Sequence, residues 1–375
     1  MTTNKKPKIL YVASTQSHLE RFHEPYIKRL SKQATVKTMA TGDYVDYTIK
    51  FEKNLFSLGN VMRIRKIRKI LRREQFDAVI LNTTLAAFLV RAALPRGKGR
   101  PYVLNVVHGY LFGHRLRGLK SRLMLRCEKM MRKKTDDIAV MNAEDREIAK
   151  KYKLCMGEVF FMNGMGLTLS PKIPKKNRTL RTKYTRDPDD FVCLFVGELS
   201  GRKNQIFLIR AMKKLADEGM PIRLLLVGEG AERQMLEEDI RAQFLEEHVF
   251  LVGSVTPVTP YLAAADLYVS ASISEGLPFN IMEAMSVGLP IVASNVKGQN
   301  DLLEQSMLYP LGDIEAFCRS VRRAYHSKNW GVGSQEYRNL DKYRIDAVFD
   351  DNMEILTAGL TKRMAQESAG EEAEK

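Results

Sequence analysis

Short apolar runs alternate along the chain with longer stretches in which apolar residues recur every three or four positions. The runs are typical of buried strands, and the stretches between them are typical of amphipathic helices. Strands are predicted at residues 9–13, 78–81, 102–107 and 137–140 in the first half, and at residues 191–196, 223–227, 250–252, 267–270 and 291–293 in the second. Because strands that alternate with helices form parallel sheets covered by helices, the pattern predicts an α/β fold with two doubly wound halves.

A segment rich in proline and charge separates these halves. It runs from Ser170 to Thr179, and a second charged stretch follows at Arg186–Asp190. A chain of 375 residues is long enough for about two domains, each with a core of its own. We predict a first domain at residues 1–180, a second at residues 181–340, a helix at residues 341–364 and a disordered acidic tail at residues 365–375.

The loop between the strands predicted at 267–270 and 291–293 is the most informative part of the sequence. It contains Glu275 and Glu283, and it lies at the carboxyl edge of a parallel sheet, where open α/β folds bind ligands. A carboxylate about one turn into a helix can accept both hydroxyls of a ribose, and a carboxylate on the loop can reach another hydroxyl group. The alternative is that Glu283 only complements a helix dipole and Glu275 is a solvated loop residue.

The backbone of the same loop suits an anion. Gly276 allows a ligand to approach closely, Pro278 stiffens the turn, and the amides near Phe279 and Asn280 open a helix whose N-terminus favours phosphate. A phosphate site between two carboxylates indicates a ligand with hydroxyls at both ends. That description fits a nucleotide sugar.

Cations follow another predicted strand of the second half. Gly197 ends the strand at 191–196, and Arg202 and Lys203 come shortly after it. A pair of cations there can neutralise a diphosphate and stabilise the charge that develops on a leaving group, although ordinary surface charges are the alternative. In the first half, His108 directly follows the strand at 102–107 and so also lies at a carboxyl edge.

Several of these segments resemble the family 4 glycosyltransferases in order and spacing. The segments that resemble the family's C-terminal domain are residues 191–205, 224–230, 249–255 and 261–266, followed by the two-glutamate loop. The segments that resemble the N-terminal domain of the branch building bacterial capsule and exopolysaccharide repeat units are residues 8–13, His18, 22–26, 106–112, 135–138 and 144–145. The resemblance covers most of the chain and is strongest over residues 190–305.

The resemblance implies a GT-B fold, in which two Rossmann-like domains face each other across a cleft and a C-terminal helix returns to the N-terminal domain. It also implies a retaining, metal-independent hexosyltransferase that moves a hexose from a UDP-sugar to a lipid-linked saccharide of the undecaprenyl diphosphate type. Such an enzyme acts in capsule or exopolysaccharide assembly. It needs no cofactor, since the UDP-sugar is its donor substrate.

The resemblance also assigns roles to single residues. His108 and Glu275 are the expected catalytic residues, and Ser17 and His18 are expected on the acceptor side. Most relatives carry an arginine where this chain has Glu198, so Arg202 is expected to supply that cation. The residues expected to bind the nucleotide sugar are Gly197, Arg202, Lys203, Gly276, Pro278, Phe279, Asn280 and Glu283.

Three motifs of other protein classes are excluded. Gly228-Glu-Gly230 is not a dinucleotide fingerprint, because Arg233 stands where its third glycine is required. The D-x-D of Asp187–Asp190 lies in the linker, away from the expected diphosphate, so no catalytic metal is predicted there. The cysteines are scattered without a C-x-x-C pair, which predicts free thiols and no metal site: Cys127, Cys155, Cys193 and Cys318.

The chain is strongly basic, with 60 Lys and Arg against 44 Asp and Glu and a net charge of +16. The excess gathers at residues 63–73 and 115–134, and in the first of these segments Ile64, Ile67, Ile70 and Leu71 form an apolar stripe. A basic surface can bind an anionic membrane, although a solvated helix face is the alternative. No apolar run is long enough to span a bilayer and no signal peptide is visible, so a cytoplasmic, peripheral enzyme on the inner membrane face is predicted.

Other functions remain as alternatives at this point. Specific nucleic-acid binding is disfavoured, because no zinc-finger, RNP or bZIP pattern accompanies the basic segments. A GT-B-like nucleotide-sugar epimerase would interconvert UDP-sugars without a lipid acceptor. A non-catalytic protein that binds lipid or polyanion would show neither reaction, and its binding would depend steeply on salt.

Overall fold

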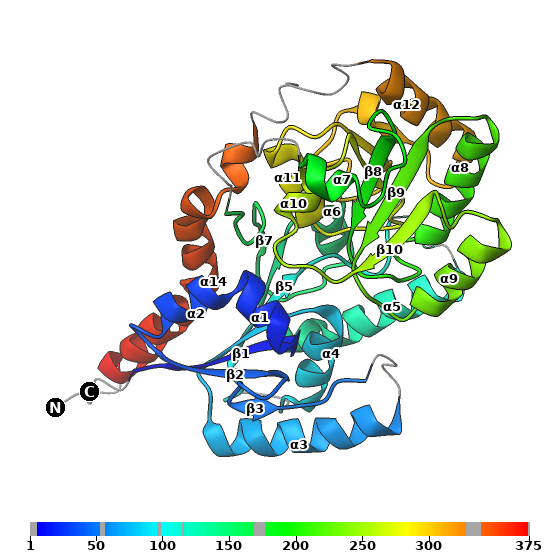
Figure 1. Cartoon of the computed structure of the whole chain (residues 1–375). Coiled ribbons are helices and arrows are strands. Elements are labelled where there is room, and N and C mark those ends of the chain that lie inside the picture. The colour runs from blue at the N-terminus through cyan, green and yellow to red at the C-terminus, as the bar shows by residue number, and fades with distance from the viewer. Residues whose placement is uncertain are drawn as a thin grey trace. The chain divides into compact units, whose positions relative to one another are not determined.

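The computed structural model describes residues 6–52, 57–95, 99–114, 116, 118–168, 177–327 and 339–373, without the side chains of residues 339 and 363–373. The chain divides into two compact units, Met1–Gly166 with Ile345–Lys375 and Leu167–Arg344 (Figure 1). Residues 170–176 of the expected linker, residues 374–375 of the expected tail, and Arg115 and Arg117 in the basic segment lie outside the described residues.

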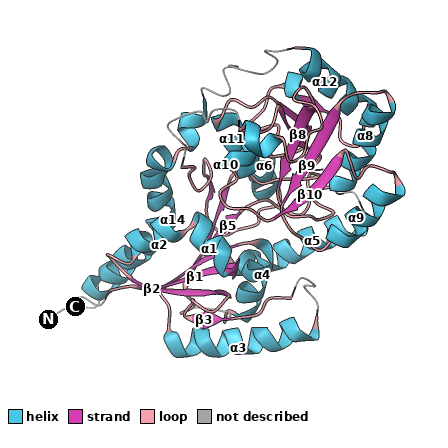
Figure 2. Ribbon diagram, in the orientation of Figure 1, coloured by secondary structure: helices cyan, strands magenta, loops and turns pink. Residues whose placement is uncertain are grey.

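The first unit contains a parallel sheet in the order β3-β2-β1-β4-β5-β6-β7. Figure 2 labels its strands β1, β2, β3 and β5. Its strands are β1 (Lys8–Thr15), β2 (Thr35–Thr41), β3 (Tyr47–Thr48), β4 (Ala78–Asn82), β5 (Tyr102–Val107), β6 (Asp137–Val140) and β7 (Val159–Phe161). Its helices are α1 (Gln16–Phe22), α2 (Glu24–Leu30), α3 (Leu58–Glu74), α4 (Thr84–Ala93), α5 (Gly118–Met131), the 3-10 helix η1 (Arg132–Lys134), α6 (Ala143–Lys151) and α14 (Ile345–Ala373).

Apolar faces join these helices to the sheet. Ile67, Ile70 and Leu71 of α3 are buried in one cluster with β1, β4 and α4, and Ile64 packs against that cluster. This confirms the apolar stripe predicted from the spacing of these four residues. Helices α5 and α6 share a second cluster with β5 and β6.

The second unit contains a parallel sheet in the order β10-β9-β8-β11-β12-β13. Its strands are β8 (Phe191–Val196), β9 (Ile222–Val227), β10 (Val249–Gly253), β11 (Leu267–Ser270), β12 (Ile291–Ser294) and β13 (Leu308–Tyr309). Its helices are α7 (Arg178–Arg181), α8 (Gln205–Asp217), α9 (Arg233–Ala242), α10 (Thr259–Leu262), α11 (Phe279–Ser286), η2 (Gln305–Met307), α12 (Ile314–His326) and η3 (Asn339–Tyr343). Helices α8, α9 and α12 pack into one core with the strands, and α10 and α11 lie on the other side of the sheet (Figure 1).

The C-terminal helix α14 belongs to the first unit, as the predicted fold requires. The side-chain amide of Asn352 donates a 2.9 Å hydrogen bond to the hydroxyl of Tyr26, and Phe349 stacks on the ring of Tyr26 with centroids 5.0 Å apart. Gly359 lies against β5, where a Cβ atom would come within 1.9 Å of the Tyr102 ring. A residue without a side chain at position 359 therefore allows the helix to reach the sheet.

The observed boundaries differ from the expected ones at two places. The units change at residues 166/167 and 344/345, whereas the sequence placed the changes at 180/181 and 340/341. The expected disordered tail is replaced by helix as far as Ala373, because its glutamate, alanine and glutamine residues are good helix formers that extend α14.

Among the residues that the structure describes, all nine predicted strands are present, together with four that were not predicted. Three of these, β3, β7 and β13, are edge strands of two or three residues, too short for an apolar periodicity to show. The fourth, β2, has only two buried residues, since it lies beside the short strand β3. The four cysteines are free and buried, as predicted.

Candidate functional site

In the second unit, two loops at the carboxyl edge of the sheet are hydrogen-bonded to each other. One follows β8 and contains Arg202 and Lys203, and the other follows β11 and contains Glu275. The backbone N–H of Ile273 donates to the carbonyl of Arg202 at 2.8 Å, and the side-chain amide of Asn204 donates to the carbonyl of Ala271 at 3.3 Å. The sheet order places β8 beside β11, so residues some 70 positions apart in sequence meet at one edge.

The two cations and the loop carboxylate form one ion cluster. Lys203 Nζ lies 2.6 Å from Glu275 Oε1, and Arg202 Nη1 lies 2.7 Å from Glu275 Oε2. Arg202 also donates to the carbonyl of Ser274 at 3.1 Å. Lys203 and Glu275 are 8% and 7% exposed, whereas the Arg202 side chain is 41% exposed, so only the arginine faces solvent.

Burial and pairing act in opposite directions on these groups. Burial raises the pKa of the Glu275 carboxyl, but Lys203 and Arg202 together lower it further, so its pKa lies below the ordinary value. Burial lowers the pKa of the Lys203 ammonium below its ordinary value against the pull of Glu275. The charge of exposed Glu198 also favours the charged form of Lys203.

Glu283 lies near the same loops, within helix α11. The phenol of Tyr268 on β11 has its pKa raised well above the ordinary value, by burial and by the charges of both Glu283 and Glu275. The side-chain amide of Asn280 donates to the carbonyl of Val196 at 2.7 Å and so ties α11 to the end of β8. The two glutamates of the predicted site therefore act on one buried tyrosine at the strand ends.

Helix α11 begins directly after this loop. Pro278 is its N-cap residue and makes no side-chain cap hydrogen bond, and its carbonyl accepts from the N–H groups of Ile281 and Met282. The predicted helix start at Phe279 is confirmed, and the first turn carries no acidic side chain. An anion at this end would meet the positive end of the helix dipole without competition from a capping carboxylate.

Close backbone contacts hold these loops together. A Cβ atom on Gly228 would lie 1.9 Å from the carbonyl oxygen of Gly197, and Gly228 has φ +141°. A Cβ atom on Gly298 would lie 2.5 Å from the carbonyl oxygen of Gly276. Gly228 and Gly298 therefore allow neighbouring loops to approach the two predicted site glycines. Gly298 was not among the predicted site residues, because it follows a different strand, β12.

A buried polar network supports the loop after β11, and the sequence did not indicate it. Gln299 donates to Ser270 Oγ at 2.7 Å, and Ser294 Oγ donates to the carbonyl of Ser272 at 2.6 Å and to Gln299 Oε1 at 3.1 Å. Ser272 in turn bonds the carboxylate of Glu275. The network fixes the backbone from which Glu275 extends.

In the first unit, three histidines meet at the carboxyl edge of the sheet. His18 lies in α1 after β1, His23 lies between α1 and α2, and His108 follows β5; one ring nitrogen of each lies within 4.8 Å of the others. Burial lowers the pKa of His18 to about 4 and holds the pKa of His23 and His108 well below the ordinary value, so all three imidazoles are neutral at pH 7. His23 is a member that the sequence did not single out, because its neighbours come from distant strands.

Ser17, the remaining predicted site residue of the first unit, is more exposed than the three histidines. Ser17 lies in the first turn of α1, where its hydroxyl donates to Thr15 Oγ1 at 3.2 Å. Thr15 is the N-cap residue and also accepts from the N–H of His18. Ser17 and the histidines belong to one unit and the ion cluster to the other, so the predicted residues form two groups.

The D-x-D segment has a structural role. Asp190 is buried and pairs with Arg223 at 3.0 Å, and its carboxylate accepts from the N–H of Arg186 at 2.8 Å. Asp187 accepts from the N–H of Asp189 at 2.8 Å. These carboxylates therefore fix a turn before β8.

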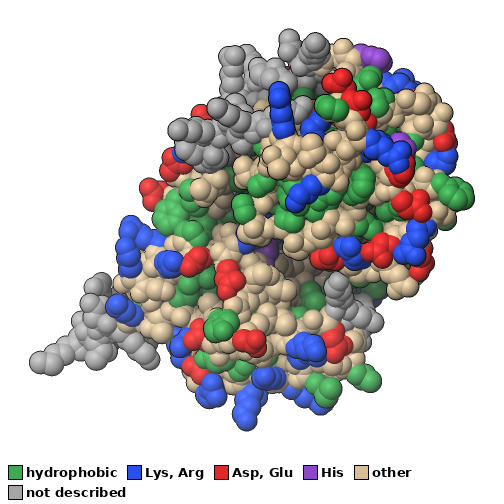
Figure 3. Space-filling model, viewed as in Figure 1, with side chains coloured by type: hydrophobic (Ala, Val, Ile, Leu, Met, Phe, Trp, Pro, Cys, Tyr) green, Lys and Arg blue, Asp and Glu red, His purple; other side chains and the backbone are tan. Residues whose placement is uncertain are grey.

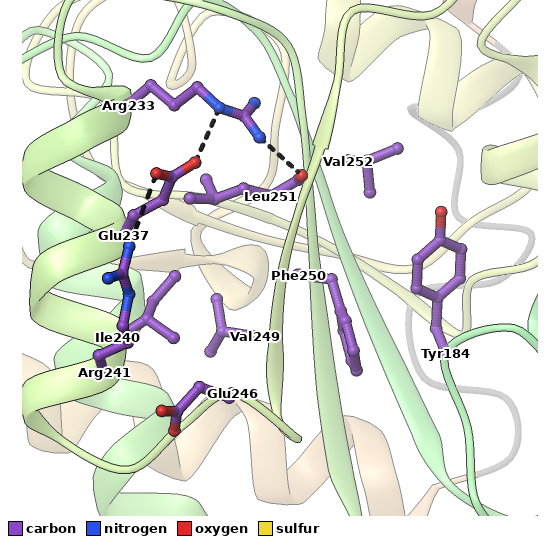
Figure 4. Close-up of a pocket in the computed structure, with 10 residues that line it drawn as sticks. All are labelled: Tyr184, Arg233, Glu237, Ile240, Arg241, Glu246, Val249, Phe250, Leu251 and Val252. Carbon is purple, nitrogen blue, oxygen red and sulfur yellow. Dashed lines mark hydrogen bonds and ion pairs between the residues drawn. The ribbon is translucent and has the colours of Figure 1, made fainter.

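A separate hollow of about 400 Å³ lies along the edge strand β10, between α9 and Tyr184 (Figure 4). Arg233 and Arg241 line it, and both pair with Glu237. None of the predicted site residues lines this hollow.

Basic residues cover two helices of the first unit. Figure 3 shows Lys and Arg side chains along the lower edge of the molecule, where Figure 1 places α3. Helix α5 exposes Lys120, Arg122, Arg126 and Lys129 beside Leu119, which is 82% exposed. No helix among the described residues is both long enough and apolar enough to cross a bilayer.

Both halves of the chain match models of known families. Residues 26–159 match the family described as Glycosyltransferase Family 4, and residues 190–327 match the family described as Glycosyl transferases group 1. The two matches follow one another along the chain, with residues 160–189 between them, and together cover most of it.

Individual relatives match nearly the whole length. The Bacillus subtilis (strain 168) protein EpsD, which is described as a glycosyltransferase, is 29% identical over 85% of this chain and 87% of its own. The Escherichia coli UDP-Gal:alpha-D-GlcNAc-diphosphoundecaprenol alpha-1,3-galactosyltransferase is 27% identical over 79% of this chain and 80% of its own. The crystal structure of Anabaena Alr3699/HepE in complex with UDP and glucose has a TM-score of 0.71 at 18% identity, over 94% of this chain and 100% of that one. With two parallel α/β sheets, a returning C-terminal helix and both family matches, this chain belongs to the group 1, family 4 glycosyltransferases and has the GT-B fold.

Proposed function

We propose that this glycosyltransferase moves a hexose from a UDP-sugar to a lipid-linked saccharide of the undecaprenyl diphosphate type, with retention at the anomeric carbon. The observation that carries the proposal is the cluster of Arg202, Lys203 and Glu275 beside the start of α11. The cluster and α11 together offer two cations and a helix N-terminus to a diphosphate, and the carboxylates of Glu275 and Glu283 to the hydroxyls on either side of it.

The relatives support the choice of donor and acceptor. The Escherichia coli relative is named as a UDP-Gal transferase acting on a diphosphoundecaprenol saccharide, and the Anabaena structure holds UDP and glucose. A donor with a uridine diphosphate and an acceptor on a polyprenyl diphosphate fit both names and the cationic loops described above. Polysaccharide assembly is the process in which such a product is used.

Each site residue has a role in the proposal. Glu283 accepts the ribose hydroxyls, Arg202 and Lys203 bind the diphosphate, and Glu275 with the loop from Gly276 to Asn280 holds the donor sugar and the phosphate nearest to it. Gly197 keeps the end of β8 open to the nucleotide. Arg202 is the exposed cation of the cluster, so it makes the first contact with the incoming diphosphate. Lys203, the buried cation, stabilises the negative charge of the diphosphate.

The proposed transfer balances without a metal ion. The bond between the anomeric carbon and the diphosphate oxygen breaks, and its electron pair leaves with UDP. The acceptor hydroxyl oxygen forms the new bond on the same face of the sugar, and its proton passes to the leaving diphosphate oxygen. His108, neutral at pH 7, orients the donor sugar by a hydrogen bond, while Ser17 and His18 contact the acceptor.

The basic and apolar surface of the first unit suits the membrane in which such an acceptor lies. On α5, Leu119, Leu123 and Met130 are exposed among the lysines and arginines, and on α3 Leu58 and Met62 are exposed beside a basic stretch. Exposed apolar residues among basic ones are typical of helices that bind at a lipid interface. We therefore place the enzyme peripherally on the inner face of the cell membrane.

A donor screen tests the proposal. The full chain would be incubated with UDP-hexoses and with polyprenyl diphosphate saccharides, and the lipid product and UDP would be measured by mass spectrometry. UDP release that depends on the lipid acceptor, with a product heavier by one hexose, is the expected result. Acceptor-free interconversion of UDP-sugars would instead support an epimerase, and neither reaction across the screen would overturn the assignment.

A further inference from the structure

We infer that His18, His23 and His108 form a binding site for a divalent transition-metal ion such as Zn²⁺, and that the ion acts as an inhibitor. Three of the six histidines of the chain meet there, with a ring nitrogen of each within 4.8 Å of the others. Their ring centroids are 4.9 to 5.3 Å apart, and His108 stands edge-on to both of the other rings.

Two of the nitrogens lack a partner. The Nε2 atoms of His18 and His23 are buried and have no hydrogen-bond partner in the described structure, and His23 is 0% exposed. A buried polar atom without a partner costs free energy, so two such atoms in one group of three histidines are unusual unless something binds there. A metal ion coordinated by both nitrogens would remove that cost.

The surrounding residues can set the tautomers that a metal requires. The hydroxyl of Tyr11 lies 2.9 Å from His23 Nδ1 and can accept a hydrogen bond from Nδ1–H, and in that tautomer the lone pair of His23 is on Nε2. Asn82 donates to the carbonyl of Val12 at 3.1 Å, which turns its oxygen toward His108 Nε2, 3.4 Å away. With Nε2 protonated, His108 offers Nδ1 to the ion. Ligating histidines commonly have such a partner on their other nitrogen.

The donor set selects the kind of ion. Imidazole nitrogens suit Zn²⁺, Cu²⁺, Ni²⁺ and Fe²⁺, whereas Mg²⁺ and Ca²⁺ prefer oxygen ligands, and the group contains no carboxylate. With zinc–nitrogen bonds of about 2.0–2.1 Å, tetrahedral ligands lie about 3.4 Å apart, so nitrogens now within 4.8 Å of one another must close by at most about 1.4 Å. His18 and His108 are only half-buried, which leaves them room to turn.

The inhibitory part of the inference rests on the proposed function. An ion bound to His108 occupies the nitrogen that would orient the donor sugar, and an ion bound to His18 blocks the acceptor side. The inferred ion is therefore no catalyst. It is a ligand that competes with substrate, and removing it with a chelator should restore transfer.

Metal binding can be measured without any activity assay. The full chain would be titrated with Zn²⁺ in calorimetry, and with Co²⁺ to record the visible bands of tetrahedral cobalt. We expect one ion per chain and no thiolate charge-transfer band. His18→Ala should weaken Zn²⁺ binding by more than the roughly 10- to 100-fold that follows loss of a ligand's hydrogen-bond partner. His114→Ala, which removes an exposed histidine paired with Glu147 in the same unit, should bind as the unaltered chain does.

Two results would overturn the site: no Zn²⁺ binding by the folded chain, or equal binding by the His18→Ala and His114→Ala variants. His18→Asn, with circular dichroism of each variant, guards against a folding defect. Inhibition is tested separately in the transferase assay, where Zn²⁺ should lower and EDTA restore the rate. Activity that is indifferent to Zn²⁺ in a chain that binds it would overturn the inhibitory role alone, and absence of transfer with every donor would count against the proposed function while leaving the binding result intact.

Discussion

Lys203 and Glu275 form a buried ion pair with 2.6 Å between Nζ and Oε1, although 71 residues separate them in the sequence. The two side chains are 10% and 7% exposed. Their contact joins the loop after β8 to the loop after β11. It therefore holds the two loops of the site together and keeps an ammonium and a carboxylate charged inside it.

Removing one partner of this pair should be costly. Glu275→Gln leaves the Lys203 ammonium buried without its carboxylate, and we expect a loss of about 3–5 kcal/mol in the free energy of unfolding. The double variant Lys203→Met/Glu275→Met removes both charges and should recover much of that loss. Urea unfolding of the three chains at pH 7 measures the difference, and equal stability of the single and double variants would show that the pair is not coupled.

The same carboxylate predicts a dependence of stability on pH. The pKa of Glu275 is lower in the folded chain than its unfolded value of about 4.3, so its stabilising effect is complete above that value. The effect is lost as the pH falls through the folded pKa, because the carboxyl must then be protonated. Between pH 5 and pH 3 the unaltered chain should lose more stability than Glu275→Gln. If urea unfolding showed the same change in the free energy of unfolding with pH for both chains over this range, the prediction would be wrong.

Nucleotide binding should depend on Glu283. In the proposal this carboxylate accepts two ribose hydroxyls, and hydrogen bonds to a charged group contribute about 1.5–3 kcal/mol each. Glu283→Gln should therefore weaken UDP binding in calorimetry by at least about tenfold without a change in thermal stability. Glu238→Gln, at an exposed position on α9, is the control. Unchanged UDP affinity in Glu283→Gln would remove the ribose role.

Gly228 should tolerate no side chain. Gly228→Ala places a Cβ atom 1.9 Å from the carbonyl oxygen of Gly197, and that backbone cannot move without breaking the loop from which the cations extend. Gly219→Ala is a matched control, because Gly219 has φ +79° and open space around its Cβ position. The control should lose about 1–2 kcal/mol from backbone strain alone, and Gly228→Ala should lose more and bind UDP less tightly. A similar loss of stability in both variants would show that the close contact at Gly228 does not contribute to the effect.

Membrane binding should follow the charge of α5. Arg122→Gln/Arg126→Gln removes two exposed charges, each contributing about 1 kcal/mol at an anionic surface, so partition onto vesicles of anionic phospholipid should fall about 30-fold. Arg210→Gln/Arg319→Gln removes the same charge from exposed positions in the second unit and should leave partition unchanged. Equal effects of the two pairs in vesicle sedimentation would assign binding to net charge instead of to α5.

The sequence predicted the parts of the site that lie within single motifs. Glu275, Gly276 and Pro278 share one loop, and Arg202 and Lys203 share another, so spacing and strand ends were enough to place them. It could not predict that Glu275 pairs with both cations, because that contact depends on β8 lying beside β11 in the sheet order.

The three-histidine group shows the same limit more sharply. His18 and His108 were separate candidates, and His23 was part of a resembling segment without a role. They converge because β1, β4 and β5 are neighbours, an arrangement that the apolar pattern does not encode. The supporting network of Ser270, Ser294 and Gln299 was missed for the same reason.

The attachment of α14 to Tyr26 and β5 has a consequence for how the protein is made. The first unit is built from both ends of the chain, so its core stays incomplete until residues near Asn352 have left the ribosome. The second unit is continuous in sequence and can form during synthesis. We expect the second unit of the nascent protein to be folded while the first unit still exposes apolar surface. The first unit is therefore the part most in need of chaperones.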